Sequence, residues 1–183
     1  MTAREIEEYK ALRATIRERG TARHWILLAG IAVWATLTLA LAFLGAVPVA
    51  VLVPLTVLVA TFEAIVALHI GVERVGRYLQ VFYETDGNSA QWEHAAMHYG
   101  RTFGGGGIDA LFSPLFWVAT VFNLIPAVHV DLRPVEWMVL LGVHLLFAWR
   151  IWSAKRQAAV QRAVDLERFT KLRSDSNGSA PSA

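Results

Sequence analysis

The sequence predicts an all-α, polytopic membrane protein with four transmembrane helices, an amphipathic N-terminal helix, and cytoplasmic extensions of the second and fourth spans. Hydrophobic residues make up 55% of the 183-residue chain, and the mean hydropathy of +0.42 is high for a soluble domain. The apolar residues are concentrated in four long runs, at residues 25–44, 49–72, 108–127 and 135–152. Runs of this length are typical of helices that cross a bilayer.

The basic residues indicate how these runs are oriented. Six Lys and Arg precede the first run, none lies between the first and second, three follow the second, one follows the third, and seven begin at Arg150. If each run crosses once, sixteen of the seventeen basic residues lie on one side. Because cytoplasmic loops carry the excess of Lys and Arg, we expect both termini and residues 73–107 in the cytoplasm of a bacterial-type inner membrane.

Composition narrows the function classes. The formal net charge is only +2, and fifteen acidic residues are interleaved with the basic ones. Since nucleic-acid binding needs a dense basic surface, nucleic acid is not an expected partner, whereas membrane lipids are. The chain contains no cysteine, which excludes disulfides and thiolate metal sites. No cofactor is predicted.

The chain begins with an amphipathic segment, residues 1–24. Within residues 3–19, Ile6, Tyr9 and Leu12 are followed by Ile16 at helical spacing, and Gly20 is expected to end this helix. Its charges keep it out of the hydrocarbon, so it either lies among lipid headgroups or packs on another cytoplasmic helix. The acidic leader favours an uncleaved anchor over a signal peptide.

The helical pattern of the second span does not stop at the membrane boundary. Residues 73–84 keep the apolar spacing of three and four, and residues 153–173 continue the fourth span in the same way. Together with residues 3–19 these segments would form a collar of cytoplasmic helices. The first two spans are joined by residues 45–48 only, which predicts an antiparallel hairpin.

The region between the second and third spans is polar and rich in turns. It contains a short helical piece, QWEHAAMHY, and four glycines, Gly104 to Gly107, that predict a flexible joint. The C-terminal residues 174–183 are small and polar, and we expect them to be disordered.

The third run is the weakest span. It contains Asp109 at its start, Pro114 in its first turns, and Asn123 and Pro126 in its second half, so a re-entrant segment is an alternative. If this run failed to cross, however, the seven C-terminal basic residues would lie outside the cell. The orientation rule therefore favours four crossings.

Glu63 and His144 are the main candidates for an intramembrane site. Both lie at comparable depth in their spans, so they could form a hydrogen bond or bind a proton or small cation. Thr36, Thr38 and Asn123 are further polar residues expected in the same interior. The alternative is a structural role, in which these polar groups fix the register of the helices.

Two further clusters lie outside the spans. Arg74 and Arg77 are expected at headgroup level, where they could hold a lipid phosphate, although a Glu73–Arg77 ion pair explains the pattern without function. His94 and His98 are spaced i, i+4, so both could reach one metal ion.

Glu93, Glu84 or Asp86 could add an oxygen ligand to this pair. The HExxH order of zinc proteases is absent, which weakens the metal hypothesis.

The sequence therefore supports three functional hypotheses. The first is a noncatalytic membrane subunit or scaffold that forms a homo-oligomer or binds another protein. The second is a proton or small-cation channel or carrier that uses Glu63 and His144. The third is a metal-dependent membrane enzyme that uses His94 and His98.

Overall fold

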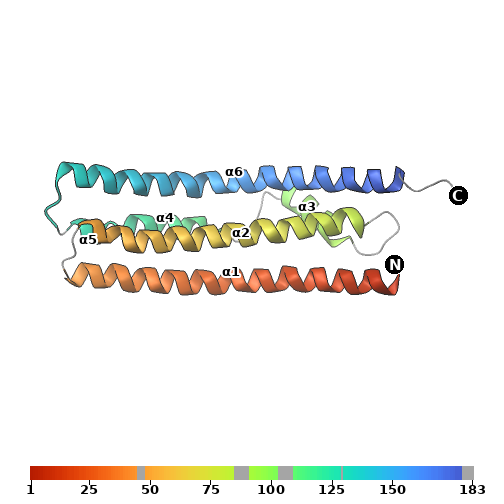
Figure 1. Ribbon diagram of the computed structural model, residues 1–183, viewed down its shortest axis with the longest axis horizontal. Helices are drawn as coiled ribbons and strands as arrows, with labels where there is room; N and C mark the ends of the chain where they lie inside the picture. The colour runs from red at the N-terminus through yellow and green to blue at the C-terminus, as the bar shows by residue number, and fades with distance from the viewer. Residues whose placement is uncertain (45–47, 85–90, 103–108, 129, 179–183) are drawn as a thin grey trace. The chain divides into compact units, whose positions relative to one another are not determined.

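The computed structural model describes residues 1–44, 48–84, 91–102, 109–128 and 130–178. Within these ranges the chain forms helices and no strand, so the predicted all-α class is confirmed. The helices are α1 (Ala3–Leu44), α2 (Leu52–Phe82), α3 (Trp92–Thr102), α4 (Ser113–Phe122), α5 (Ile125–Val128) and α6 (Pro134–Gly178), with a 3-10 turn, η1 (Pro48–Val51), before α2 (Figure 1). Among the described residues, three helices are long and apolar enough to cross a membrane: α1, α2 with the residues just before it, and α6.

α1 is one helix of 42 residues, which corrects the prediction that a separate helix ends at Gly20. A single glycine inside a helix costs only about 1 kcal/mol relative to alanine. The amphipathic turns before Gly20 and the apolar turns after it favour continuation, so this cost does not stop the helix.

α2 and α6 also continue beyond the predicted ends of their spans. α2 passes residue 72 and ends at Phe82, and α6 passes residue 152 and ends at Gly178. The first part of the predicted disordered tail, residues 174–178, is therefore helical. The hydroxyl of Ser174 donates to the carbonyl of Lys171 and that of Ser176 to the carbonyl of Arg173, which ties these polar residues to the helix. Residues 179–183 and the predicted glycine joint lie outside the described residues.

The third apolar run forms two short helices instead of one span-length helix. Phe112 has a positive φ of 51° immediately before α4, and the carboxylate of Asp109 accepts hydrogen bonds from the backbone N–H groups of Leu111 and Ser113. α4 ends at Phe122, and α5 follows after a turn, with Pro126 inside it. The helix therefore starts later than predicted, because Asp109 holds an irregular turn before it.

The chain divides into two compact units. Unit 1 comprises Met1–Thr21, Leu68–Ile108 and Gln157–Ala183, and unit 2 comprises Ala22–Ala67 and Asp109–Arg156. Unit 2 thus contains most of the four predicted spans, except residues 68–72 and 108, and unit 1 contains the three predicted collar segments except residues 153–156.

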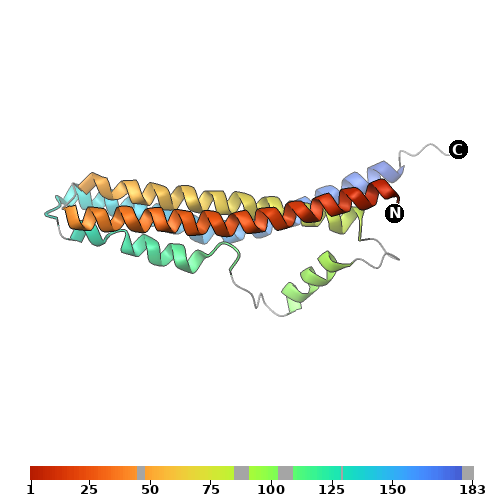
Figure 2. The ribbon, with the colours of Figure 1, turned by 90° about the horizontal axis from the view of Figure 1, so that it is seen from below.

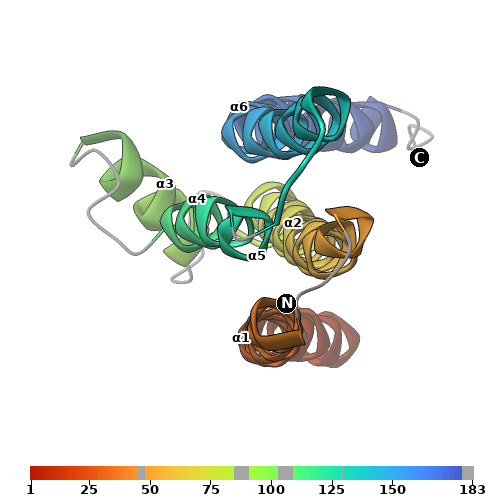
Figure 3. The same cartoon turned by 90° about the vertical axis from the view of Figure 1, so that its left-hand side faces the viewer.

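Within unit 2, segments of α1, α2 and α6 run side by side with α4 alongside α2 (Figures 2 and 3). The ring of Phe62 packs edge-on against Phe116 of α4 and Phe147 of α6, with centroid separations of 5.0 and 5.9 Å. Gly30 of α1 lies directly against Thr61 of α2, where a Cβ would come within 2.2 Å of the threonine hydroxyl.

The α4–α5 segment follows much of the length of α6 inside unit 2. At its start, Asp109 pairs with Lys155 at 2.8 Å. At its end, Ala127 packs with Val51 of η1 and Leu140 of α6. Since Lys155 and Leu140 are fifteen residues apart, the segment extends over about 22 Å of α6.

Candidate functional sites

The interior of unit 2 contains a polar network centred on Asn123. Its side-chain oxygen accepts the indole N–H of Trp34 at 3.0 Å, and its amide nitrogen lies 3.1 Å from the carbonyl oxygen of Val51 and 3.0 Å from Nε2 of His144. The second ring nitrogen of His144 lies 2.7 Å from the carbonyl oxygen of Leu140, one turn earlier in α6. Asn123 is fully buried and His144 is 4% exposed, so the network is closed to the surroundings.

These contacts define the protonation of His144. A carbonyl oxygen only accepts, so Nδ1 carries the proton that is donated to Leu140. An amide nitrogen only donates, so Nε2 must be the unprotonated acceptor of Asn123. The imidazole is thus neutral, and both its nitrogens are used. The indole of Trp34 and the amide of Asn123 likewise have their donors and acceptors satisfied, which makes the network a structural link between α1, η1, α4 and α6.

Of the two threonines expected in this interior, one is buried. Thr36 is exposed, and its hydroxyl donates to the carbonyl of Ala32 in its own helix. Thr38 is 8% exposed, and its hydroxyl has no hydrogen-bond partner among the described residues.

Glu63 is bound by Arg150. The guanidinium Nε lies 2.7 Å from Oε1 and Nη2 lies 2.8 Å from Oε2, so the contact is bidentate. The guanidinium also lies 5.8 Å from the ring centroid of Phe62. The side chain of Glu63 is 43% exposed and that of Arg150 is 26% exposed, so the pair is at the surface of unit 2.

The predicted hydrogen bond between Glu63 and His144 is therefore wrong. The two residues lie at comparable depth, but depth does not determine which side of a helix a residue occupies. His144 and Arg150 are six residues apart, which places them about 240° apart around α6. α6 thus presents Arg150 to Glu63, while His144 faces Asn123.

A groove of about 480 Å³ lies beside this ion pair, between α2 and α6. Its walls are mostly apolar and include Val59 on α2 and Leu146 and Trp149 on α6. Arg150 also lines the groove. The Nη1 atom of Arg150 is buried and has no hydrogen-bond partner within the described part of the chain.

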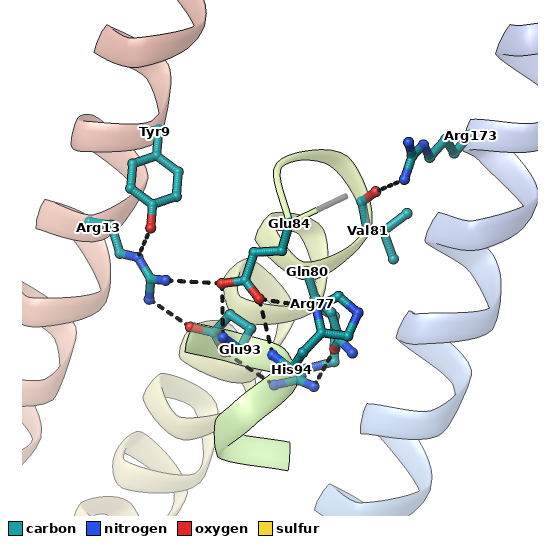
Figure 4. A network of polar contacts seen from close by, with 9 residues as sticks. All are labelled: Tyr9, Arg13, Arg77, Gln80, Val81, Glu84, Glu93, His94 and Arg173. Carbon is teal, nitrogen blue, oxygen red and sulfur yellow. Dashed lines mark hydrogen bonds and ion pairs between the residues drawn. The ribbon is translucent and has the colours of Figure 1, made fainter. Parts of the chain in front are cut away.

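Unit 1 contains a second polar network, which holds α3 (Figure 4). The carboxylate of Glu84, at the end of α2, accepts the backbone N–H groups of Glu93 and His94 at 2.8 and 3.0 Å. It also lies 3.1 Å from Nδ1 of His94 and 3.5 Å from Arg13. The side chain of Glu84 is fully buried, and because it accepts these two N–H groups it acts as a cap for the first turn of α3.

The charges of this network are balanced. Arg13 of α1 pairs with Glu93 at 2.6 Å, and Arg77 of α2 pairs with the same carboxylate at 3.3 Å. Burial acts to lower the pKa of Arg13, but hydrogen bonds to Tyr9 and Glu93 outweigh it and the pKa is raised. Burial lowers the pKa of Arg77, and its neighbouring carboxylates oppose the effect.

Arg74 and Arg77, the candidates for lipid phosphate, both bind acidic side chains of unit 1. Arg74 is half exposed and pairs with Asp165 of α6 at 3.2 Å. Arg77 is 4% exposed and also donates to Gln80 at 2.6 Å. The expected Glu73–Arg77 pair is replaced by a contact of 2.6 Å between Glu73 and Arg162 of α6, because the two extended helices pack on each other.

The metal candidates lie on α3. His94 contacts Glu84 as described, and Glu93 is occupied by Arg13 and Arg77. In the described ranges, no three His, Asp or Glu side chains are grouped so that they could hold one metal ion. Of the possible oxygen ligands, Glu93 is therefore committed to arginines and Glu84 to the first turn of α3, and Asp86 lies outside the described residues.

Arg150, Trp34 and Arg13 belong to these networks, although none of them is among the candidates predicted from the sequence. Two of them carry a recognisable signal. Arg150 is the one basic residue inside the run 135–152, and Trp34 lies in the middle of a run in which tryptophan is expected at the ends. Arg13 carries no such signal, since its partners Glu84 and Glu93 are 71 and 80 residues away in the chain.

Comparisons with protein-family models, with curated proteins and with solved structures found no match to this chain.

Proposed function

We propose that this protein is a noncatalytic membrane subunit or scaffold that works as a homo-oligomer or bound to another membrane protein. The observation that carries the proposal is the Glu63–Arg150 pair at the surface of unit 2, in which the Glu63 side chain is 43% exposed. Apolar side chains of this unit such as Leu28, Val33 and Leu145 are each at least half exposed, as suits a surface in contact with lipid.

An ion pair on such a surface is costly. A charged side chain near the middle of a membrane costs about 2.5–3.5 kcal/mol on insertion scales, and pairing removes only part of this cost. A neighbouring transmembrane helix that covers Glu63 and fills the adjacent groove would remove the exposure. The closed Asn123 network offers no comparable open group, so the Glu63–Arg150 face is the favoured contact surface.

The proposed orientation in the membrane rests on the distribution of the basic residues. We propose four crossings, formed by α1, α2, the α4–α5 segment and α6, with both termini in the cytoplasm of a bacterial-type inner membrane. The α4–α5 segment extends about 22 Å along α6, which is most of a hydrocarbon core of about 30 Å. Unit 1 would then be the cytoplasmic part, and its ion pairs would lie in water instead of lipid.

The main competing function is a proton or small-cation carrier. In that case Glu63 must release Arg150 to bind an ion, and His144 must leave its hydrogen bonds to Asn123 and Leu140. Reconstituted liposomes distinguish the two functions, because a carrier passes ions and Glu63→Gln abolishes or alters that flux, whereas a scaffold passes none.

The proposal is tested by light scattering of the protein in a mild detergent. We expect a protein mass of at least twice the 20.3 kDa of one chain, or the mass of a complex with a second protein. The double variant Glu63→Leu/Arg150→Leu removes the pair without leaving one charge unpaired, and it should weaken the association at least tenfold. Val33→Leu, on an exposed position of α1, is the matched control and should leave it unchanged. A strict monomer that crosslinks to no protein in its native membrane would overturn the proposal.

A further inference from the structure

Unit 1 contains a cavity of about 560 Å³ between the end of α2, the first turn of α3 and the last turns of α6. Its lining is predominantly polar, in contrast to the apolar groove of unit 2. The residues that matter for its chemistry are Gln80 from α2, Glu84 just after α2, His94 from α3, and Thr170 and Arg173 from α6. Residues far apart in the sequence thus contribute to one site.

Arg173 brings a positive charge to this cavity. Its guanidinium donates one hydrogen bond to the carbonyl oxygen of Val81, a contact that aims the side chain at the end of α2 (Figure 4). Within the described part of the chain, Arg173 forms no ion pair with a carboxylate. A guanidinium has five N–H donors, so most of its donors remain available.

Glu84 does not cancel this charge. Its side chain is fully buried, and its two oxygens already receive the guanidinium of Arg13, two backbone N–H groups and the ring of His94. The carboxylate is therefore neutralised by its own network, and it presents no exposed negative surface to a ligand.

One more side chain, Gln80, can donate into the cavity. The oxygen of Gln80 accepts from Arg77 at 2.6 Å, which leaves the amide nitrogen as the free end of that side chain. His94 also lines the cavity, but its Nδ1 donates to the Glu84 carboxylate at 3.1 Å, so the Nε2 of the neutral ring is an acceptor and gives no hydrogen bond to an anion.

We propose that this cavity binds a small organic anion, with a carboxylate or phosphate group held by Arg173 and assisted by the amide nitrogen of Gln80. Arginine binds such groups through two parallel hydrogen bonds. The volume lies within the range of about 300–1,000 Å³ that is typical of small-molecule sites. Because the ligand contacts α2, α3 and α6 together, it would stabilise unit 1, a role that the proposed scaffold function does not itself require.

The test uses the full chain in detergent, with inorganic phosphate and acetate as probes in isothermal titration calorimetry. We expect at least one of the two anions to bind the wild-type protein, and Arg173→Gln to weaken that binding at least tenfold. Arg168→Gln is the matched control, since Arg168 is exposed on the same helix and does not line the cavity. Chloride at equal ionic strength controls for nonspecific screening.

A second measurement needs no variant and so does not depend on the folding of Arg173→Gln. The bound anion should protect Arg173, but not Arg168, from modification by phenylglyoxal, as read by peptide mass spectrometry. Failure of both anions to bind, equal loss of binding in both variants, or equal protection of the two arginines would each overturn the proposal.

Discussion

The Nε2 atom of His144 lies 3.0 Å from the amide nitrogen of Asn123, and this contact joins α6 to α4 inside unit 2. The same asparagine binds Trp34 and Val51, so one side chain connects four segments. Every polar side-chain atom of this network has a hydrogen-bond partner. Removal of the Asn123 side chain would therefore leave several buried polar groups unpaired at once.

Asn123→Ala should therefore destabilise the protein. Side-chain hydrogen bonds inside membrane proteins average about 0.6 kcal/mol each, and three are lost, so we expect a decrease of about 2 kcal/mol in the free energy of unfolding. Unfolding in mixed detergent micelles measures this change. Thr36→Ala is the control, because Thr36 is exposed and bonds only to its own helix, and it should change the stability by less than about 0.5 kcal/mol. Equal effects would contradict the assigned network.

Gly30→Ala should loosen the packing of α1 on α2. The added Cβ would lie 2.2 Å from the hydroxyl oxygen of Thr61 and 2.8 Å from its Cβ, and Thr61 is held by a hydrogen bond to Val57. Overpacking of this kind costs about 1–3 kcal/mol. Gly142→Ala in α6 of the same unit meets nothing within 4 Å and should be neutral or slightly stabilising. The same unfolding assay compares the two glycine variants. A smaller loss of stability in Gly30→Ala than in Gly142→Ala would contradict the close packing of α1 on α2.

Glu84→Ala should release the first turn of α3. The variant removes the acceptor of two backbone N–H groups and leaves Arg13 with one carboxylate fewer. Loss of a helix cap costs about 0.5–2 kcal/mol, so amide hydrogen exchange in α3 should accelerate by about tenfold. Glu167→Ala, at an exposed position of α6, should leave the exchange of α3 unchanged. Unchanged protection of α3 in Glu84→Ala would show that the cap is unimportant.

Through Tyr83, the stability of unit 1 should depend on pH in the alkaline range. Burial and then a hydrogen bond to Glu8 raise the pKa of Tyr83 to about 12, from about 10 in an unfolded chain. A raised pKa means that the neutral phenol is favoured in the folded state, so its contribution is complete below pH 10 and is lost as the pH rises to about 12.

Tyrosinate absorbance tests this pKa directly. In the wild type, one tyrosine should ionise near pH 12, and this step should be absent in Tyr83→Phe. Tyr99→Phe, at an exposed position of α3, should retain it. Ionisation of all four tyrosines near their ordinary pKa would contradict the burial of Tyr83.

Much of the helical content could be predicted because it depends on local patterns. The apolar runs predicted α1, α2 and α6, and the QWEHAAMHY segment predicted the short helix α3. Gly20 was misleading for the same reason. A local signal for a helix end was weaker than the preference of the residues on both sides to remain helical.

The sites were harder to predict because their members are distant in the chain. Asn123 and His144 were each expected to be buried, but the sequence did not show that they bind each other. Depth in the membrane predicts His144 as the partner of Glu63. The partner is instead Arg150, which the charge pattern groups with the basic residues of the cytoplasmic side. Such pairings depend on the rotation of each helix about its axis, and apolar periodicity fixes that rotation only loosely.

We expect the face formed by Glu63, Arg150 and the adjacent groove to be covered by another protein in the membrane. The chain contains no cysteine, so a single cysteine can carry a photoactivated crosslinker without background. In native membranes, Leu146→Cys, in the groove, should yield a protein adduct of higher mass, and Val33→Cys, exposed on α1, should not. If Leu146→Cys gives no protein adduct, or if both positions give the same adducts, the claim is contradicted.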